Sequence, residues 1–521
     1  MQTFLGRMKQ EVKGTLSGLD RVRFRGTIRW LSSLQGLGSY LGTVRVLLKD
    51  FRGWARGLTD QIDKATERLA EAAGRPVEYL ASSRERKETR ALDIAAADGV
   101  TEGLIAVLKC VEPCHTFQVG PNAATKRLEL RHGPGKCSHL YFYTLDRQWG
   151  LTHLRLQTWA PFTIHVCLNG REWLARQLTR AKIGFDQRDN CFVDVDDFAQ
   201  AQTLLSRQLR TDWSRTLDGL ARRWHPAHRA MFTTPSLDYY WSAEETEWAT
   251  DVLFRSPAAL AAVYPKLLHH ATTTFGSRDV LRFLGQVPCV DRRTTREIIS
   301  STLTRPEGTR VKHAINRNSL KMYDKQQSVL RIETTINDPR DMKVYRPKEG
   351  AADGPKSWQR LRKGVADLHR RAEVSQKSNE RYLETLAAVD HDQPLGETVR
   401  PVCQPTQFQG RRVRALQPLA PADGALLAAV VRGEFALNGF RNRDLRPLLC
   451  PAASPTEPSP ADLKRQSAKI TRQIRLLRAH GLIQKVSKTH RYTLTNAGRQ
   501  TIVALQTAQQ ASTLKLNQLA A

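Results

Sequence analysis

Residues 311–337 read VKHAINRNSLKMYDKQQSVLRIETTIN, and the rest of the chain is organised around this stretch. Residues 319–323 and 329–336 alternate apolar and polar side chains, which predicts two β-strands, and the polar residues 324–328 suit a hairpin turn. One face of this hairpin should be mostly apolar, with Leu320, Met322, Leu330, Ile332, Thr334 and Ile336. The other face should carry Lys321, Tyr323, Arg331, Glu333 and Thr335. A tyrosine, a carboxylate and two cations on one face indicate a reactive site. The alternative is a structural hairpin whose tyrosine packs at a sheet edge.

The hairpin contains two short motifs, KMYDK at 321–325 and RIE at 331–333. In this order they resemble the nucleophile region of the rolling-circle replication initiators of small plasmids and filamentous phages. The resemblance covers residues 311–337 and implies that Tyr323 attacks a DNA phosphodiester and becomes joined to the 5′ end. It also implies a divalent metal, Mg²⁺ or Mn²⁺, that polarises the phosphate. We assign Lys321, Lys325 and Arg331 to stabilising the charge that develops on the phosphate, because a tyrosine is a weak nucleophile near neutral pH.

The sequence departs from this family in its candidate metal ligands. Many of these initiators carry a His-apolar-His triplet on one strand, and this sequence has none. His153 and His165 each fall in the middle of an expected strand, where a histidine can also be purely structural. Plasmid initiators tolerate carboxylate ligands, so Glu333 and Asp324 are further candidates, and we favour Glu333.

A second group of metal-binding residue types lies earlier in the chain. Cys110-x3-Cys114 and Cys137-x-His139 offer four soft ligands for a tetrahedral zinc ion. The spacings are irregular, whereas zinc ribbons prefer Cys-x2-Cys. This irregularity favours buried free thiols over a structural zinc.

The composition points to a polyanionic partner. The chain has 521 residues, enough for about three domains, and a formal net charge of +30. Such an excess of Lys and Arg favours nucleic acid over a membrane surface, with DNA expected first and RNA left open. No run of about 18 apolar residues and no secretory signal are present. The eight scattered cysteines fit reduced thiols, so we expect a cytoplasmic protein that acts alone or as a homodimer.

The order of the patterns predicts an α+β fold with a central antiparallel or mixed sheet. Residues 1–75 are predicted to be mostly helical. The basic alternation over 21–30 also suits a strand, whose basic face either meets phosphate or is simply solvated. Residues 76–388 alternate strands and helices, with a helical insertion over about 210–300 that includes Trp248 and Val252. We expect residues 239–241, YYW, to anchor the core rather than to stack on bases. The proline-rich segment 389–422 is a predicted linker.

The last segment, residues 423–521, resembles the winged helix-turn-helix of MarR-type regulators. Three helices, a basic two-stranded tip and a closing helix are expected, with a long helix from Ser459-Pro460 to about Ala479. From Leu463 onward there is no Asp or Glu. The expected phosphate-contacting side chains in this segment are Lys464, Arg465, Lys469, Arg472, Arg475, Lys485, Lys488 and Arg491.

Together these patterns predict a DNA-binding protein of a plasmid or other mobile element. It would nick and join DNA through Tyr323, as a replication initiator, relaxase or transposase-like enzyme. Two alternatives remain: a non-catalytic winged-helix regulator, and an RNA-binding partner of a structured transcript.

Overall fold

In the computed structural model the chain has an α+β fold, as predicted. The structure describes residues 1–82, 84–225, 227–233, 236–273, 275, 277–285, 298–305, 308–348, 354–387, 395–432, 435, 439–450, 459–486 and 489–512. No helix in these ranges is both long and apolar enough to cross a membrane.

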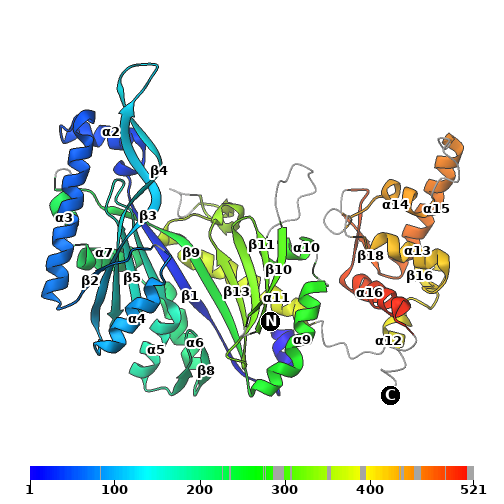
Figure 1. The fold of residues 1–521 in the computed structure, drawn as a ribbon. Helices are drawn as coiled ribbons and strands as arrows, with labels where there is room; N and C mark the ends of the chain where they lie inside the picture. The colour runs from blue at the N-terminus through cyan, green and yellow to red at the C-terminus, as the bar shows by residue number, and fades with distance from the viewer. Residues whose placement is uncertain are drawn as a thin grey trace.

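One sheet of eleven strands dominates the molecule (Figure 1). Its strands lie in the order β10 (Ile298–Arg305), β11 (Gly308–Ile315), β12 (Asn318–Lys325), β13 (Val329–Ile336), β9 (Tyr239–Phe254), β1 (Val12–Ile28), β6 (Ile164–Asn169), β5 (Gly150–Gln157), β4 (Leu128–Asp146), β3 (Gly103–Pro121) and β2 (Val77–Tyr79). All neighbours are antiparallel except β2 and β3, which are parallel. The sheet is therefore mixed, with one parallel pair at its edge.

The predicted hairpin is strands β12 and β13, and its two faces are as expected. Lys325 pairs with Val329, so the loop is residues 326–328, shorter than predicted, with positive φ at Gln326 and Gln327. The apolar face packs against helix α11 (Leu368–Leu386), where Asn379 accepts a 2.6 Å hydrogen bond from Thr334 Oγ1. The polar face carries Tyr323 and Glu333 and lies on the other side of the sheet.

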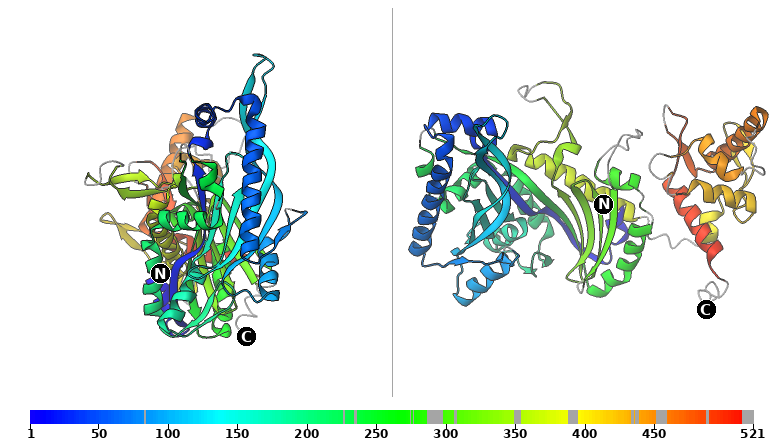
Figure 2. Two further views of the ribbon diagram at one scale, coloured as in Figure 1. Left: turned by 90° about the vertical axis from the view of Figure 1, so that its left-hand side faces the viewer. Right: turned by 45° about the horizontal axis from the view of Figure 1, so that its top comes forward.

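Helices cover both faces of the sheet at the β2 edge. Helix α3 (Phe51–Ala72) packs on the face that carries Val107 and Phe142. Helix α4 (Lys87–Ala97) packs on the face that carries Leu108 and Tyr141. Since neighbouring residues of a strand point to opposite sides, α3 and α4 lie on opposite faces. Figure 2 gives two further views of this layering.

The predicted helices over residues 1–75 are present, but the region is not separate from the sheet. It contains α1 (Gln2–Arg7), α2 (Leu34–Thr43) and α3, and also β1, which pairs with β6 and β9 in the middle of the sheet. The strand considered for the basic alternation over residues 21–30 is correct over residues 21–28, the last part of β1.

The helical insertion over about 210–300 is correct only in part. Helices α7 (Trp213–Trp224), α8 (Ala227–Met231), α9 (Pro257–Thr273) and α10 (Ser277–Phe283) lie there, with α5 (Gly170–Ala181) and α6 (Phe198–Ser206) before them. Trp248 and Val252, however, belong to strand β9. A spacing of four residues puts two side chains on one face of a helix and also on one face of a strand, so this spacing could not distinguish a helix from a strand. Of the YYW triplet at the start of β9, Trp241 is buried in the core as predicted and Tyr239 is partly buried, but Tyr240 is exposed.

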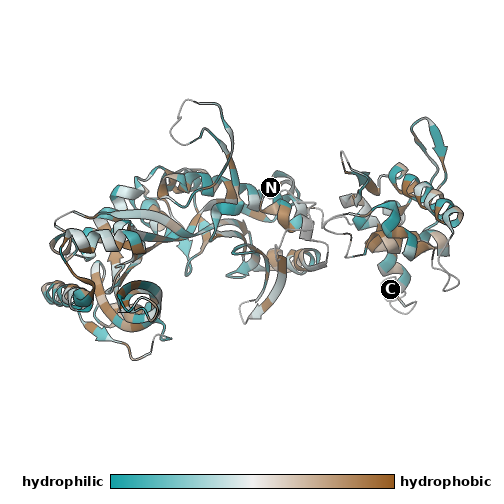
Figure 3. Cartoon of the chain, turned by 90° about the horizontal axis from the view of Figure 1, so that it is seen from above, coloured by the Kyte–Doolittle hydropathy of each residue, from teal (hydrophilic) through white to brown (hydrophobic). Residues whose placement is uncertain are grey.

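The segment after residue 394 folds as a second unit, seen beside the sheet in Figure 3. It contains α12 (Leu395–Val399), β16 (Thr406–Phe408), β17 (Arg411–Val413), α13 (Pro421–Val430), α14 (Asn442–Leu449), α15 (Pro460–Ala479), β18 (Ile483–Lys485), β19 (Tyr492–Leu494) and α16 (Asn496–Gln510). Val402 and Leu416 are buried in its core, so the described part of the predicted linker belongs to this unit. Residues 388–394 lie outside the described ranges.

Candidate functional site: a tyrosine beside three carboxylates

The polar face of the hairpin joins Tyr323 to Glu333. The Tyr323 hydroxyl donates a 2.6 Å hydrogen bond to Glu333 Oε2, and Lys321 Nζ lies 2.5 Å from Glu333 Oε1. Lys321 Nζ also lies 3.4 Å from Glu247 Oε1 on the neighbouring strand β9. Tyr323 is partly exposed, whereas Glu333 is buried. The Tyr323 ring is therefore partly exposed, whereas its hydroxyl is enclosed and held by a buried carboxylate.

A β-bulge in β1 brings a third carboxylate to this place. Leu19 pairs with Trp248 and Val22 pairs with Thr246, so Asp20 and Arg21 together face the single residue Glu247. Carboxylate oxygens of Asp20, Glu247 and Glu333 lie within 4.8 Å of one another. Three carboxylates at this spacing are typical ligands of a hard divalent cation. We call them the carboxylate cluster.

The sequence analysis found only Glu333 of this cluster. Nothing near Asp20 or Glu247 in the sequence marks them as partners, because a pairing across three strands with a bulge brings them together. The only signal in the sequence was an acidic residue, Asp20, beside the basic residues of β1. A single acidic residue does not show which side chain it will meet.

Burial and mutual repulsion set the charges of the cluster. Burial, together with the negative charge of Glu333, raises the pKa of Glu247 to about 7. Burial also opposes ionisation of Glu333, but the Lys321 ammonium and the hydrogen bonds from Lys321 and Tyr323 hold its pKa below the usual value. Burial and the Glu333 charge raise the pKa of Tyr323 well above 10, so the resting phenol keeps its proton.

Arg331 lies beneath the cluster rather than in front of it. Its guanidinium is fully buried, with Nε 2.6 Å from Asp251 Oδ1 and Nη1 3.2 Å from Asp20. Arg171, also fully buried, lies 2.9 Å from Asp251. This burial contradicts the prediction that Arg331 contacts a phosphate. Its role in the structure is to position Asp20.

Cations lie close to each carboxylate of this region. Lys321 pairs with Glu333 and Glu247, Arg331 pairs with Asp20 and Asp251, and Arg171 pairs with Asp251. Arg21, which faces Glu247 across the bulge, is a fourth cation and acts to lower the pKa of Glu247. The pKa of Glu247 is raised nevertheless, because burial and the charge of Glu333 outweigh these cations.

The other predicted residues of the hairpin lie apart from the cluster. Lys325 Nζ is 3.3 Å from Asp189 Oδ2, an exposed partner at the rim. Asp324 alternates to the opposite face of β12 from Tyr323, so it does not reach the cluster. It is therefore not a ligand of the same site.

His153 and His165 are also remote from Tyr323. Strand β6, which carries His165, is three strands from β13, or about 14 Å at the usual strand spacing. Both histidines line an open cavity of 890 Å³, whose walls include Arg21, Arg23 and Arg25 of β1. His165 Nε2 lies 3.3 Å from Glu244 and the ring of His153 lies 5.0 Å from that of Tyr143. The structure thus separates the histidines from Tyr323 and places them in a cavity whose walls carry both arginines and glutamates.

The C-terminal unit presents most of its predicted contact residues on helix α15. Ile470, Ile474 and Leu477 are buried, as predicted. Lys464, Arg465, Lys469 and Arg472 are exposed, as is Lys485 on β18, whereas Arg475 and Arg491 are partly buried. Lys488 lies outside the described residues. Arg465 is held by Asp462 at 2.7 Å within the helix.

A pair of exposed aromatic residues escaped the sequence analysis. Tyr345 on β14 (Lys343–Arg346) and Trp358 on β15 (Ser357–Arg360) pair across the strands, with ring centroids 5.6 Å apart. They are 60% and 68% exposed. Their hairpin projects from the body of the molecule (Figure 2). The sequence showed only a basic, turn-rich stretch here.

No protein-family model matches the chain, and no curated protein or solved structure matches it. The resemblance to rolling-circle initiators and to a winged helix therefore stays a prediction.

Proposed function

We propose that the protein binds DNA and nicks one strand through Tyr323. The observation that carries this proposal is the 2.6 Å hydrogen bond from the Tyr323 hydroxyl to Glu333, within a cluster of three carboxylates. A plasmid or other mobile element is the setting that such an activity fits.

The chain's own residues account for the proton and the charge. As the Tyr323 oxygen bonds to phosphorus, its proton passes to Glu333, the carboxylate that already accepts its hydrogen bond. The bond from phosphorus to the 3′ oxygen breaks, and this oxygen leaves as a hydroxyl after taking up a proton. Lys321, 2.5 Å from Glu333, offers positive charge beside the reacting oxygen. Strand transfer is the reverse sequence.

The carboxylate cluster fits a divalent ion. Its donors are all oxygens, and three carboxylates within 4.8 Å of one another repel each other unless a proton or a cation lies between them. Asp20, Glu247 and Glu333 would hold Mg²⁺ or Mn²⁺, which would supply electrophilic polarisation of the phosphate when bound.

Two surfaces bear on DNA binding. Arg21, the residue that follows Asp20, lines the 890 Å³ cavity with Arg23 and Arg25, and a phosphate there would compete with Glu244 and Glu245 for these guanidinium groups. Helix α15 adds an exposed basic face on the second unit, which we assign to site selection as in a winged helix.

The test is a nicking assay on a supercoiled plasmid that carries the DNA neighbouring the gene, with Mn²⁺. The expected product is open-circular DNA that stays joined to the protein after denaturation. Tyr323→Phe should abolish both nicking and joining, and Tyr79→Phe, a change at an exposed tyrosine elsewhere, should not.

Each other outcome favours another function. Nicking that survives Tyr323→Phe would contradict the proposed nucleophile. Retarded DNA without cleavage would favour a non-catalytic regulator, and preferential capture of RNA would favour the RNA-binding alternative.

A further inference from the structure

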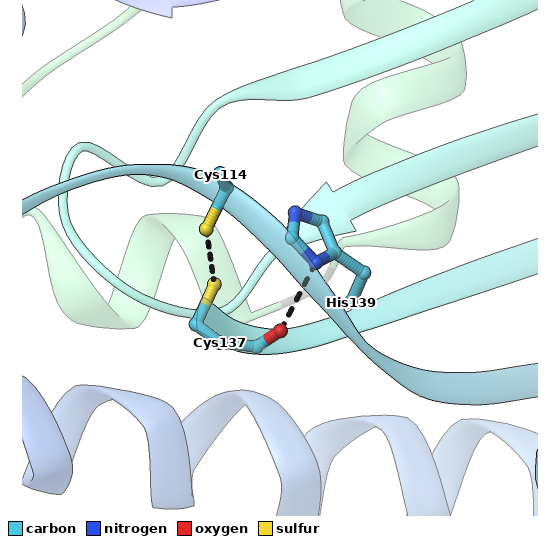
Figure 4. A group of neighbouring side chains, drawn as sticks. All are labelled: Cys114, Cys137 and His139. Atoms are coloured by element: carbon cyan, nitrogen blue, oxygen red, sulfur yellow. Dashed lines mark hydrogen bonds between the residues drawn. The ribbon is translucent and has the colours of Figure 1, made fainter. Parts of the chain in front are cut away.

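Two cysteines and a histidine meet on strands β3 and β4, far from Tyr323. Cys114 Sγ and Cys137 Sγ are 3.3 Å apart, and one ligand atom from each of Cys114, Cys137 and His139 lies within 4.8 Å of the other two (Figure 4). A tetrahedral zinc ion holds its sulfur ligands about 3.8 Å apart, from bonds of about 2.3 Å. Small side-chain rotations would therefore open the group to an ion. Cys110, the fourth residue of the sequence pattern, instead hydrogen-bonds Glu112 at 3.2 Å.

The imidazole of His139 is arranged as a ligand. The side chain is fully buried, and its Nδ1 lies 3.2 Å from the carbonyl oxygen of Cys137. Its Nε2 has no hydrogen-bond partner among the described residues. When Nδ1 donates to the carbonyl, Nε2 carries a free lone pair, which is the arrangement of most metal-bound histidines. A buried nitrogen without a partner is costly, and a bound cation would satisfy it.

We propose that Cys114, Cys137 and His139 bind a zinc ion, a site separate from the carboxylate cluster and independent of the proposed nicking. Two thiolates and an imidazole select a soft or borderline cation, whereas the carboxylate cluster selects a hard one. The chain therefore offers two metal sites of different chemistry.

The fourth position of this zinc ion is left to a water molecule or an exogenous ligand. Glu112 is the nearest carboxylate, 4.0 Å from His139 Nδ1. It already accepts hydrogen bonds from Arg155 at 2.9 Å and from Tyr141 at 2.8 Å. Cys114 lines the 890 Å³ cavity, so a ligand in that cavity can reach the ion from its side. Three protein ligands with one open position are typical of zinc sites that take water or substrate.

Because of its position in the fold, the proposed zinc ion would also stabilise the structure around it. Strand β4 pairs with β5 as far as His139, which faces Gln157. Beyond this pair, β3 and β4 continue as a ribbon of two strands that rises from the sheet (Figure 1). Two-stranded ribbons are marginally stable by themselves. Zinc at Cys114 and Cys137 would link the strands at the base of the ribbon.

Metal content of the full-length chain tests the proposal first. Protein purified without chelators should contain about one zinc per chain by mass spectrometry, the stoichiometry of a single site. Cys114→Ser and Cys137→Ser should each lose it, and His139→Gln should weaken it. Cys403→Ser, at an exposed cysteine of the C-terminal unit, should retain it. Glu333→Gln should also retain it, which separates this ion from the carboxylate cluster.

Cobalt provides a test that does not depend on how the variants fold. The wild-type apoprotein with Co²⁺ should show the thiolate-to-metal charge-transfer band and the intense visible bands of a four-coordinate ion. Wild-type protein without zinc and without these bands would overturn the proposal. So would full zinc content in both cysteine variants, or a Cys114–Cys137 disulfide in the protein as isolated.

Discussion

At the scale of single residues, burial and the negative charge of Glu333 both raise the pKa of Glu247. Its carboxylate is partly enclosed and lies beside Glu333, whose pKa is held low by Lys321. The two carboxylates therefore differ: Glu333 stays charged and accepts the hydrogen bond of the Tyr323 hydroxyl, whereas the pKa of Glu247 is raised to about 7. The protonation of Glu247 should therefore affect both the stability of the fold and the binding of a cation.

We predict that Glu247→Gln removes a dependence of stability on pH. In the folded protein the pKa of Glu247 is raised to about 7, so its proton favours the fold at low pH. This contribution is complete below the unfolded pKa of about 4.5 and is lost as pH rises through about 7. Wild type should therefore lose about 2 kcal/mol relative to Glu247→Gln between about pH 5 and about pH 8.

Urea unfolding at both pH values measures this difference. Glu397→Gln on α12 is the control, and it should follow the wild type. Mn²⁺ should reduce the loss at high pH in the wild type, because an ion replaces the proton. Equal pH dependence in wild type and Glu247→Gln would contradict the assigned pKa.

A second prediction concerns the buried arginine. Arg331→Met should leave Asp20 and Asp251 without their main cation and should lower the free energy of unfolding by about 3–5 kcal/mol. Lys13→Met, at a partly exposed pair with Asp194, should cost less than about 1 kcal/mol. Chemical unfolding of both variants gives the comparison. If Arg331→Met were as stable as Lys13→Met, the buried ion network would not be a main support of the site.

At the scale of elements, the hairpin could be predicted and its neighbours could not. Strands β12 and β13 are close in sequence, one face is mostly apolar, and alternation alone fixes which side chains share a face. The partners of Glu333 come from β9 and β1, whose positions depend on pairings over most of the chain. The β-bulge in β1 then directs the Asp20 side chain toward the carboxylate cluster, and no local sequence pattern predicts this bulge. The shared face of Tyr323, Lys321 and Glu333 could thus be predicted from the sequence, whereas the contributions of Asp20 and Glu247 could not.

The β14–β15 hairpin leads to a prediction at this scale. Tyr345 and Trp358 are exposed aromatic rings on a projecting arm that also carries Lys343 and Arg360. Exposed rings beside cations are typical platforms for unpaired bases. Trp358→Ala should weaken binding of a single-stranded oligonucleotide by about 1–3 kcal/mol, without changing the free energy of unfolding.

Fluorescence anisotropy of a labelled oligonucleotide measures this affinity. Tyr79→Ala, which removes a ring of similar exposure from the edge strand β2, is the matched control and should bind as wild type does. An unchanged affinity in Trp358→Ala would mean that the arm does not contact the strand.

At the scale of the whole molecule, the proposed chemistry and the proposed choice of target lie in different units. Tyr323 and the carboxylate cluster belong to the sheet, whereas α15 belongs to the C-terminal unit with its own core. The chain carries a net charge of +30, which would attract DNA without regard to sequence. In the proposed scheme, discrimination between sequences comes from close contacts of one element, and α15 carries exposed cations and no acid from Leu463 to Ala479.

This division predicts that the two activities can be removed separately in the full chain. Lys469→Gln with Arg472→Gln should weaken binding to the target duplex and reduce the salt dependence of that binding by about two counterions. It should leave cleavage of a single-stranded oligonucleotide unchanged, because Tyr323 is in the other unit. Tyr323→Phe should do the reverse. Arg411→Gln with Arg412→Gln, which removes two equally exposed charges from β17 of the same unit, is the control and should keep target preference. Competition binding against random duplex, at several salt concentrations, separates the contributions: if both double variants lose affinity equally for target and random DNA, α15 contributes only charge, and the winged-helix assignment fails.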